Sequence, residues 1–63
     1  MKTENEYAEA LISKYRMYSD YEIDCAIIDV TNTIEAIDWH EFEFPNKQLE
    51  YYQNVLQILE DKL

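Results

Sequence analysis

The sequence has no glycine, one proline and one cysteine, and these shortages exclude several kinds of site. A single cysteine cannot close a disulfide within the chain, and with one histidine it cannot complete a standard zinc site. A glycine-rich phosphate-binding loop is excluded because its backbone turns need glycine. No apolar run reaches the roughly 18 residues that a membrane-spanning helix needs.

Positive charge is scarce as well. The 63 residues include five Lys and Arg against fourteen Asp and Glu, which gives a net charge of −9. Direct binding to nucleic acid or to an anionic membrane depends on Lys and Arg, so we expect neither. The sequence shows no secretory leader and no N-glycosylation motif, which predicts a cytoplasmic protein.

The length limits how much stability the chain can gain by folding alone. A domain of this size buries only about 60% of the surface that its unfolded chain exposes. Its core rarely supplies more than about 3–5 kcal/mol of net stability. At 48% hydrophobic residues the chain is nonetheless too apolar to be an acidic disordered tail. We therefore expect a single helical domain over 1–63, with a partner or a homodimer as a further source of stability.

The first predicted helix covers about 3–18. Thr3 and Glu6 fit a capping box, in which each side chain bonds to the backbone N–H of the other residue. Apolar side chains then recur at helical spacing along one stripe: Tyr7, Ala8, Leu11, Tyr15 and Tyr18.

The second predicted helix covers about 20–37. Ser19 and Glu22 fit another capping box, so we expect Ser19 to end one helix and cap the next. An apolar stripe follows at alternating spacings of four and three: Ile23, Ile27, Val30, Ile34 and Ile37. The density of β-branched residues makes a strand the alternative. The stripe outlasts a typical strand and no turn residues interrupt it, which favours the helix.

Residues 38–46 form the predicted connector, which carries three large aromatic side chains: Trp39, Phe42 and Phe44. The two phenylalanines alternate with glutamates, so a short strand within 38–44 remains an alternative. Pro45 disfavours helical geometry at the preceding residue. A third, strongly apolar helix is predicted over about 47–62. The fold prediction is therefore an all-α three-helix bundle with an aromatic connector at one end.

The acidic residues are concentrated in one segment. Residues 17–46 contain no Lys or Arg and hold eight acids: Asp20, Glu22, Asp24, Asp29, Glu35, Asp38, Glu41 and Glu43. On a helical projection, acidic flanks border a narrow outer strip opposite the isoleucine stripe. The strip consists of Tyr21, Cys25, Ile28, Asn32 and Trp39. Like charges held together repel and reduce stability, so this arrangement calls for an explanation.

The first functional hypothesis is a small inhibitor or decoy. Its acidic helix would cover a basic surface that a partner protein uses to bind nucleic acid, with aromatic side chains as anchors. In size and charge the chain is similar to DNA-mimic inhibitors of phages and mobile elements, such as anti-restriction and anti-CRISPR proteins. An immunity or antitoxin-like neutraliser would share this chemistry. The predicted partner-binding residues are Asp20, Tyr21, Glu22, Asp24, Ile28, Asp29, Glu35, Asp38, Trp39, Glu41 and Glu43.

The alternative hypothesis is a helical self-assembly module. It would be a homodimer or a small accessory subunit that associates through Tyr21, Cys25, Ile28 and Trp39 or through the wide apolar arc of the third helix. The acids would be only a solvated border that prevents unwanted contacts. Neither hypothesis is enzymatic, because a bundle this small offers little concavity for a catalytic site. We expect no cofactor and no metal. The spacing of Asp20, Glu22 and Asp24 begins like a calcium loop, but Cys25 and Thr31 stand where that loop needs Gly and Glu.

Overall fold

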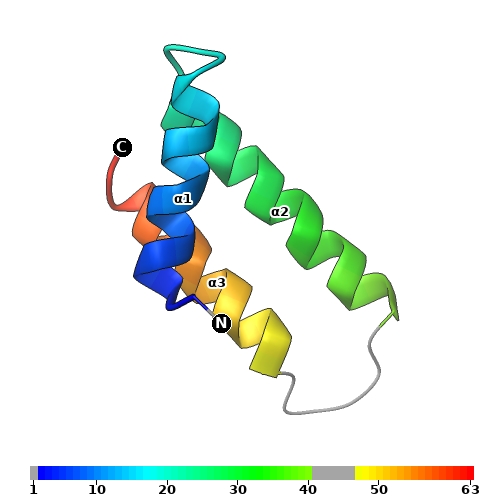
Figure 1. The fold of residues 1–63 in the computed structure, drawn as a ribbon. Coiled ribbons are helices and arrows are strands. Elements are labelled where there is room, and N and C mark those ends of the chain that lie inside the picture. Colours follow the sequence, from blue (N-terminus) through cyan, green and yellow to red (C-terminus); the bar gives the residue numbers. More distant parts are fainter. Residues whose placement is uncertain (1, 41–46) are drawn as a thin grey trace.

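The described residues of the chain form three α-helices, α1 (Glu4–Arg16), α2 (Glu22–His40) and α3 (Lys47–Glu60), in the order shown in Figure 1. This computed structural model describes the backbone of 2–40 and 47–63 and the side chains of 2–37 and 47–63. Each helix contacts both of the others. The predicted all-α three-helix bundle is confirmed, and the strand alternative for the second segment is wrong.

The start of α1 is the predicted capping box. Thr3 Oγ1 accepts a hydrogen bond from the Glu6 amide at 3.2 Å, and Glu6 Oε1 accepts one from the Thr3 amide at 2.9 Å. Lys14 and Arg16 lie in the last turn, where positive charge complements the helix dipole. The helix ends at Arg16, so Tyr18 lies beyond it and is exposed instead of continuing the apolar stripe.

The start of α2 differs from the prediction. The Ser19 hydroxyl accepts from the Tyr21 amide at 2.9 Å, two residues on, and so stabilises the turn instead of capping a helix. The Tyr21 carbonyl accepts the first helical bond, from the Cys25 amide at 2.9 Å. The predicted capping box at Ser19 is therefore wrong, and the helix begins at Glu22, two residues later than expected.

The end of α2 also differs, because the helix continues to His40. Nothing in 38–40 breaks a helix, whereas the prediction ended it where the isoleucine stripe ends. A strand over 38–40 is therefore wrong, and the helix ends three residues later than predicted. Residues 41–46, with Phe42, Phe44 and the other half of the strand alternative, lie outside the described residues.

The core lies where the three helices meet. The buried side chains are Ala8, Leu11 and Ile12 from α1, Ala26 and Val30 from α2, and Val55 and Leu59 from α3. Of the predicted isoleucines of α2, Ile23, Ile27 and Ile34 are half-buried and pack against this centre. Ala26 and Val30 reach the middle because they are small enough for α2 to approach both neighbours. Away from the 17–21 turn, α2 diverges from α1, as Figure 1 shows.

Three tyrosines join the start of α1 to α3. The rings of Tyr7, Tyr51 and Tyr52 pack edge to face, with centroids 5.2–5.9 Å apart. The Tyr51 hydroxyl also donates to the Lys2 carbonyl at 2.6 Å. Such aromatic pairs each add about 0.5–1.5 kcal/mol beyond the area they bury, which matters in so small a domain. None of the described helices has both the length and the apolar content needed to cross a bilayer.

Replacing Leu59 with Ala should unfold a large fraction of the protein. Leu59 is fully buried, and truncating such a side chain costs about 2–5 kcal/mol, which is comparable with the whole stability expected of the domain. Urea unfolding followed by circular dichroism measures the effect. The matched control is Leu63→Ala, which truncates an exposed leucine and should change the free energy of unfolding by less than about 0.5 kcal/mol. Equal effects of the two variants would contradict this core.

Candidate protein-binding surface

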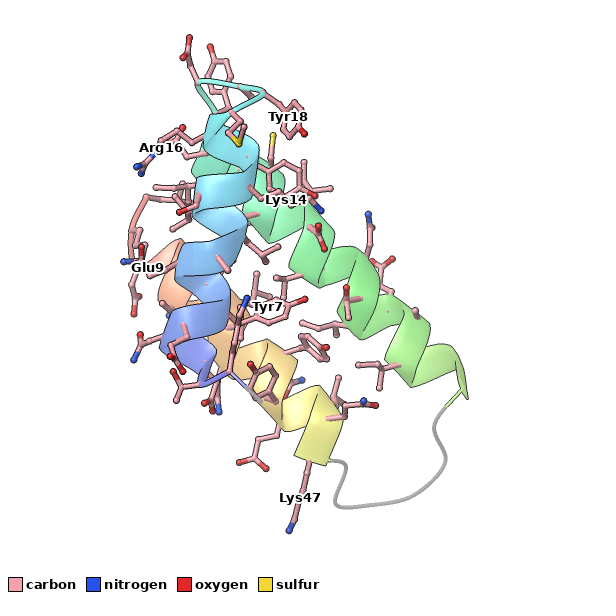
Figure 2. All side chains as sticks on the ribbon, in the orientation of Figure 1. Tyr7, Glu9, Lys14, Arg16, Tyr18 and Lys47 are labelled. Carbon is pink, nitrogen blue, oxygen red and sulfur yellow. The ribbon has the colours of Figure 1, made fainter. Side chains whose placement is uncertain are left out.

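The acidic side chains around α2 fall into two groups with different surroundings. Asp20, Asp24 and Glu35 are exposed to solvent. The ion pairs among the described residues are Arg16–Glu22 and Glu9–Lys62, so these three carboxylates have no basic partner there. Figure 2 shows Arg16 near the end of α1 and Lys47 at the start of α3, away from the middle of α2, whereas Lys14 of α1 extends toward α2 and lies over the Tyr15 ring. Lys62 shares a surface hollow with Asp20 and Asp24 but is paired with Glu9, so these exposed acids of α2 and the preceding turn have no ion pair within the described residues.

Glu22 and Asp29 face α1 instead. Arg16 Nε lies 3.7 Å from Glu22 Oε1, with the arginine largely exposed, and such a surface pair contributes about 0–1 kcal/mol. Asp29 Oδ2 accepts a hydrogen bond from the Tyr15 hydroxyl. Both carboxylates thus connect α2 to α1, and the predicted acidic surface is divided between a structural side and an open side.

The hydrogen bond to Asp29 has the largest effect on the pKa of Tyr15. It raises the pKa of the Tyr15 hydroxyl, and desolvation and the negative charge of Asp29 act in the same direction. The Lys14 ammonium lies 5.2 Å from the centroid of the Tyr15 ring, a cation–π distance. The hydrogen bond between Tyr15 and Asp29 therefore joins α1 to α2.

Large apolar side chains are exposed close to the acidic flank. Tyr21 is 69% exposed and Ile28 is 59% exposed, as the helical projection predicted for the outer strip. Met17, Tyr18 and Leu63 are exposed by 82%, 78% and 75%, and Figure 2 shows Tyr18 projecting from the turn that joins α1 to α2. Sequence reasoning missed Met17 and Leu63 as surface candidates. The early end of α1 exposes Met17, and a helical stripe gives no sign of where the helix stops.

An open groove of about 600 Å³ runs along α2 beside α1. Its lining combines apolar and small polar side chains: Tyr15, Cys25, Ile28, Asp29, Asn32, Thr33 and Ala36. The Thr33 hydroxyl donates to the Asp29 carbonyl at 3.1 Å, so it is held against the helix. Cys25 is a half-buried free thiol in this wall. The predicted outer strip is therefore partly a concave surface, which a projection onto a single helix cannot reveal.

The remaining predicted partner-binding residues are only partly described. Asp38 and Trp39 lie in the last turn of α2, but the structure does not describe their side chains, and Glu41 and Glu43 lie outside the described residues. Within the described part of the chain, no group of three His, Cys, Asp or Glu side chains could hold a metal ion. Comparisons with protein-family models, curated proteins and solved structures found no match for the chain.

Replacing Tyr15 with Phe should weaken the alkaline pH dependence of stability. Because the folded state raises the pKa of Tyr15, it holds this proton more tightly than the unfolded chain does. The stabilisation that this raised pKa represents is therefore fully present below about pH 10 and is lost as the pH rises further. Urea unfolding at a series of pH values should show a shallower fall in Tyr15→Phe.

The matched control for this measurement is Tyr18→Phe, which removes a hydroxyl from an exposed ring outside the helices. It should reproduce the wild-type profile. Tyr7 and Tyr51 also have raised pKa values, chiefly through desolvation, so part of the alkaline fall should persist in every variant. A Tyr15→Phe profile identical to that of the wild type would contradict the role given to the Tyr15–Asp29 contact.

Proposed function

We propose that this chain binds a basic surface of a partner protein through α2 and the 17–21 turn, and that the covered surface is one that otherwise binds nucleic acid. The observation that carries the proposal is the open flank of α2: Asp20, Asp24 and Glu35 are exposed and have no basic partner among the described residues. The chain would act as a small inhibitor, in the manner of a DNA mimic.

The needs of the fold account for only part of this charge. Glu22 and Asp24 lie in the first turn of α2, where acids stabilise the helix dipole. Asp29 is used by Tyr15. Glu35 lies beyond the reach of the helix start, is exposed, and pairs with no described base. Binding to a basic partner gives Glu35 and its neighbours a favourable interaction that the isolated chain does not supply.

The charge density of α2 indicates how such binding would work. The helix has 19 residues, and its described open flank carries the carboxylates of Asp24 and Glu35, which at about 1.5 Å per residue lie about 16 Å apart along the axis. Duplex DNA carries one charge per about 1.7 Å, or about 3.4 Å along one strand. The carboxylates of α2 are therefore more widely spaced than the phosphates of one DNA strand. Charge would guide association, and the exposed Tyr21 and Ile28 would supply the buried contact that gives affinity.

Self-assembly through the outer face of α2 would use the same exposed apolar side chains, but the charge pattern opposes that form of the alternative. A symmetric dimer through the outer face of α2 would bring Asp24 and Glu35 of both copies together. The described residues from 17 onwards along α2 contain no Lys or Arg to separate these charges. Juxtaposed like charges cost several kcal/mol in general, so a basic partner fits this face better than a second copy.

Reversing the charge of the open flank should abolish partner binding while leaving the helices intact. The double variant Asp24→Lys, Glu35→Lys is used as bait in bacterial lysate. The amount of nucleic-acid-binding protein that it retains should fall about 10-fold or more below the amount that the wild type retains. The physical reason is that the same side chains would now repel a basic surface. Quantitative mass spectrometry of the retained proteins measures the loss, and circular dichroism checks helicity.

The matched control is Glu50→Lys, Glu60→Lys, which makes the same change in net charge on α3. Glu50 lies in the first turn of α3 as Asp24 does in α2, and both control residues are exposed. The control should bind like the wild type. If both double variants lose the partner equally, only the overall charge matters; if neither loses it, charge does not matter. Either result would contradict a binding surface on α2.

A further inference from the structure

We infer that the groove along α2 receives a basic amphipathic helix of the partner, which inserts one apolar side chain between two cations. The inference rests on the proposed function and names the chemistry of the segment that is bound. The groove lies entirely within the described residues, and its lining joins Tyr15 of α1 to residues 25–36 of α2.

The centre of the groove is apolar. Ile28 and Ala36 are exposed, and Tyr15 and Cys25 are half-buried beside them. The polar groups in the lining are partly engaged already, because Tyr15 donates to Asp29 and Thr33 donates to the Asp29 carbonyl. An apolar side chain from a partner can therefore enter the groove without leaving those donors unpaired, which would carry a large cost.

The ridge of α2 that borders the groove is acidic, whereas on the α1 side the Lys14 ammonium lies over the Tyr15 ring. Asp24, Ile28 and Glu35 are separated by four and seven residues, so on a helix with about 100° per residue they lie within about 40° of one another on one ridge. Asp29 lies across the groove, held by Tyr15. The ridge thus has one carboxylate a turn before its apolar residue and another two turns after it.

These positions define the segment that fits. At about 1.5 Å per residue, the carboxylates at Asp24 and Glu35 are about 16 Å apart along α2, with Ile28 about 6 Å from the first. A partner helix lying along α2 reproduces this spacing with cations at positions i and i+11 and an apolar residue at i+4. Recognition of an amphipathic helix by a groove uses such anchors on one face of the bound helix.

Charge complementarity selects this occupant over a second copy or a nucleic acid. A second copy would present the same acidic ridge, and nucleic acid would present phosphates to Asp24, Asp29 and Glu35. Both arrangements place negative charges together. A helix with Lys or Arg at the two flanking positions pairs with the ridge and also contributes the apolar side chain that the groove can bury.

Synthetic peptides test the inference on the full chain. The first probe is a 15-residue helical peptide with Arg at positions 1 and 12 and Leu at position 5, made in both sequence directions. Two matched peptides replace Leu with Ser or both Arg with Gln. Fluorescence anisotropy measures binding, and amide shifts in the ¹⁵N NMR spectrum locate it. We expect one direction of the Leu peptide to shift the amides of 25–36 and to bind at least about 10-fold more tightly than either matched peptide.

Substitutions in the protein complete the test. Ile28→Ser should weaken binding of the Leu peptide at least about 5-fold, whereas Met17→Ser, which removes an exposed apolar side chain outside the groove, should not. Equal binding of the Leu and Ser peptides, or equal losses in the two protein variants, would overturn the inference. Concentration-dependent shifts of the groove amides without peptide would overturn it in favour of a second copy.

Failure of the groove and failure of the proposed function have different signatures. If the wild type retains a nucleic-acid-binding protein, the Asp24, Glu35 double variant loses it, and Ile28→Ser does not, the proposed function stands and the groove is overturned. If the double variant retains as much partner as the wild type, the proposed function fails. Peptide binding in the groove would then show a peptide-binding site that is unrelated to that function.

Discussion

The burial of Ala26 and Val30 between α1 and α3 fixes the rotation of α2 about its own axis. Once that face is in the core, every other position on α2 has an assigned direction. Asp29 turns toward Tyr15, Ile28 turns outward, and Asp24 and Glu35 lie on the open flank. The surface chemistry of the protein thus follows from the packing of two small apolar side chains.

The same packing explains why the acidic flank is a functional candidate. A domain of this size has little stability in reserve, and repulsion between like charges reduces it further. Where carboxylates serve the fold, the structure shows their partners: Thr3 for Glu6, Arg16 for Glu22, Tyr15 for Asp29 and Lys62 for Glu9. Asp20, Asp24 and Glu35 have no such ion pair within the described residues. Binding to a basic partner would offset this repulsion with a favourable electrostatic interaction.

Much of the fold could be predicted from the sequence because helical periodicity and capping are local properties. The capping box at Thr3 and the apolar stripe of α2 are examples. Helix ends were less predictable: Ser19 could cap a helix or a turn, and only the approach of α2 to α1 decides between them. Ile12 and Ala26 were missed as core residues, since the predicted stripes favoured larger side chains at other positions.

The candidate site was predictable only where it depends on α2 alone. The projection placed Tyr21 and Ile28 on the outer strip and Asp24 and Glu35 on the flank beside it, and all four are exposed in the structure. It could not show that Asp29 meets Tyr15, which lies 14 residues earlier in the chain. The groove depends on the same contact between α1 and α2. Tertiary contacts therefore decide which of the predicted acids remain available to a partner.

Displacement by DNA tests the central claim most directly. The wild-type protein, immobilised and loaded from bacterial lysate, is washed with duplex DNA at low salt and, separately, with high salt. The account predicts retention of a nucleic-acid-binding protein that both DNA and salt release, because DNA competes for the same basic surface and salt screens the charges. Recovery of only the chain itself, or of a partner that is indifferent to DNA and to salt, would contradict it.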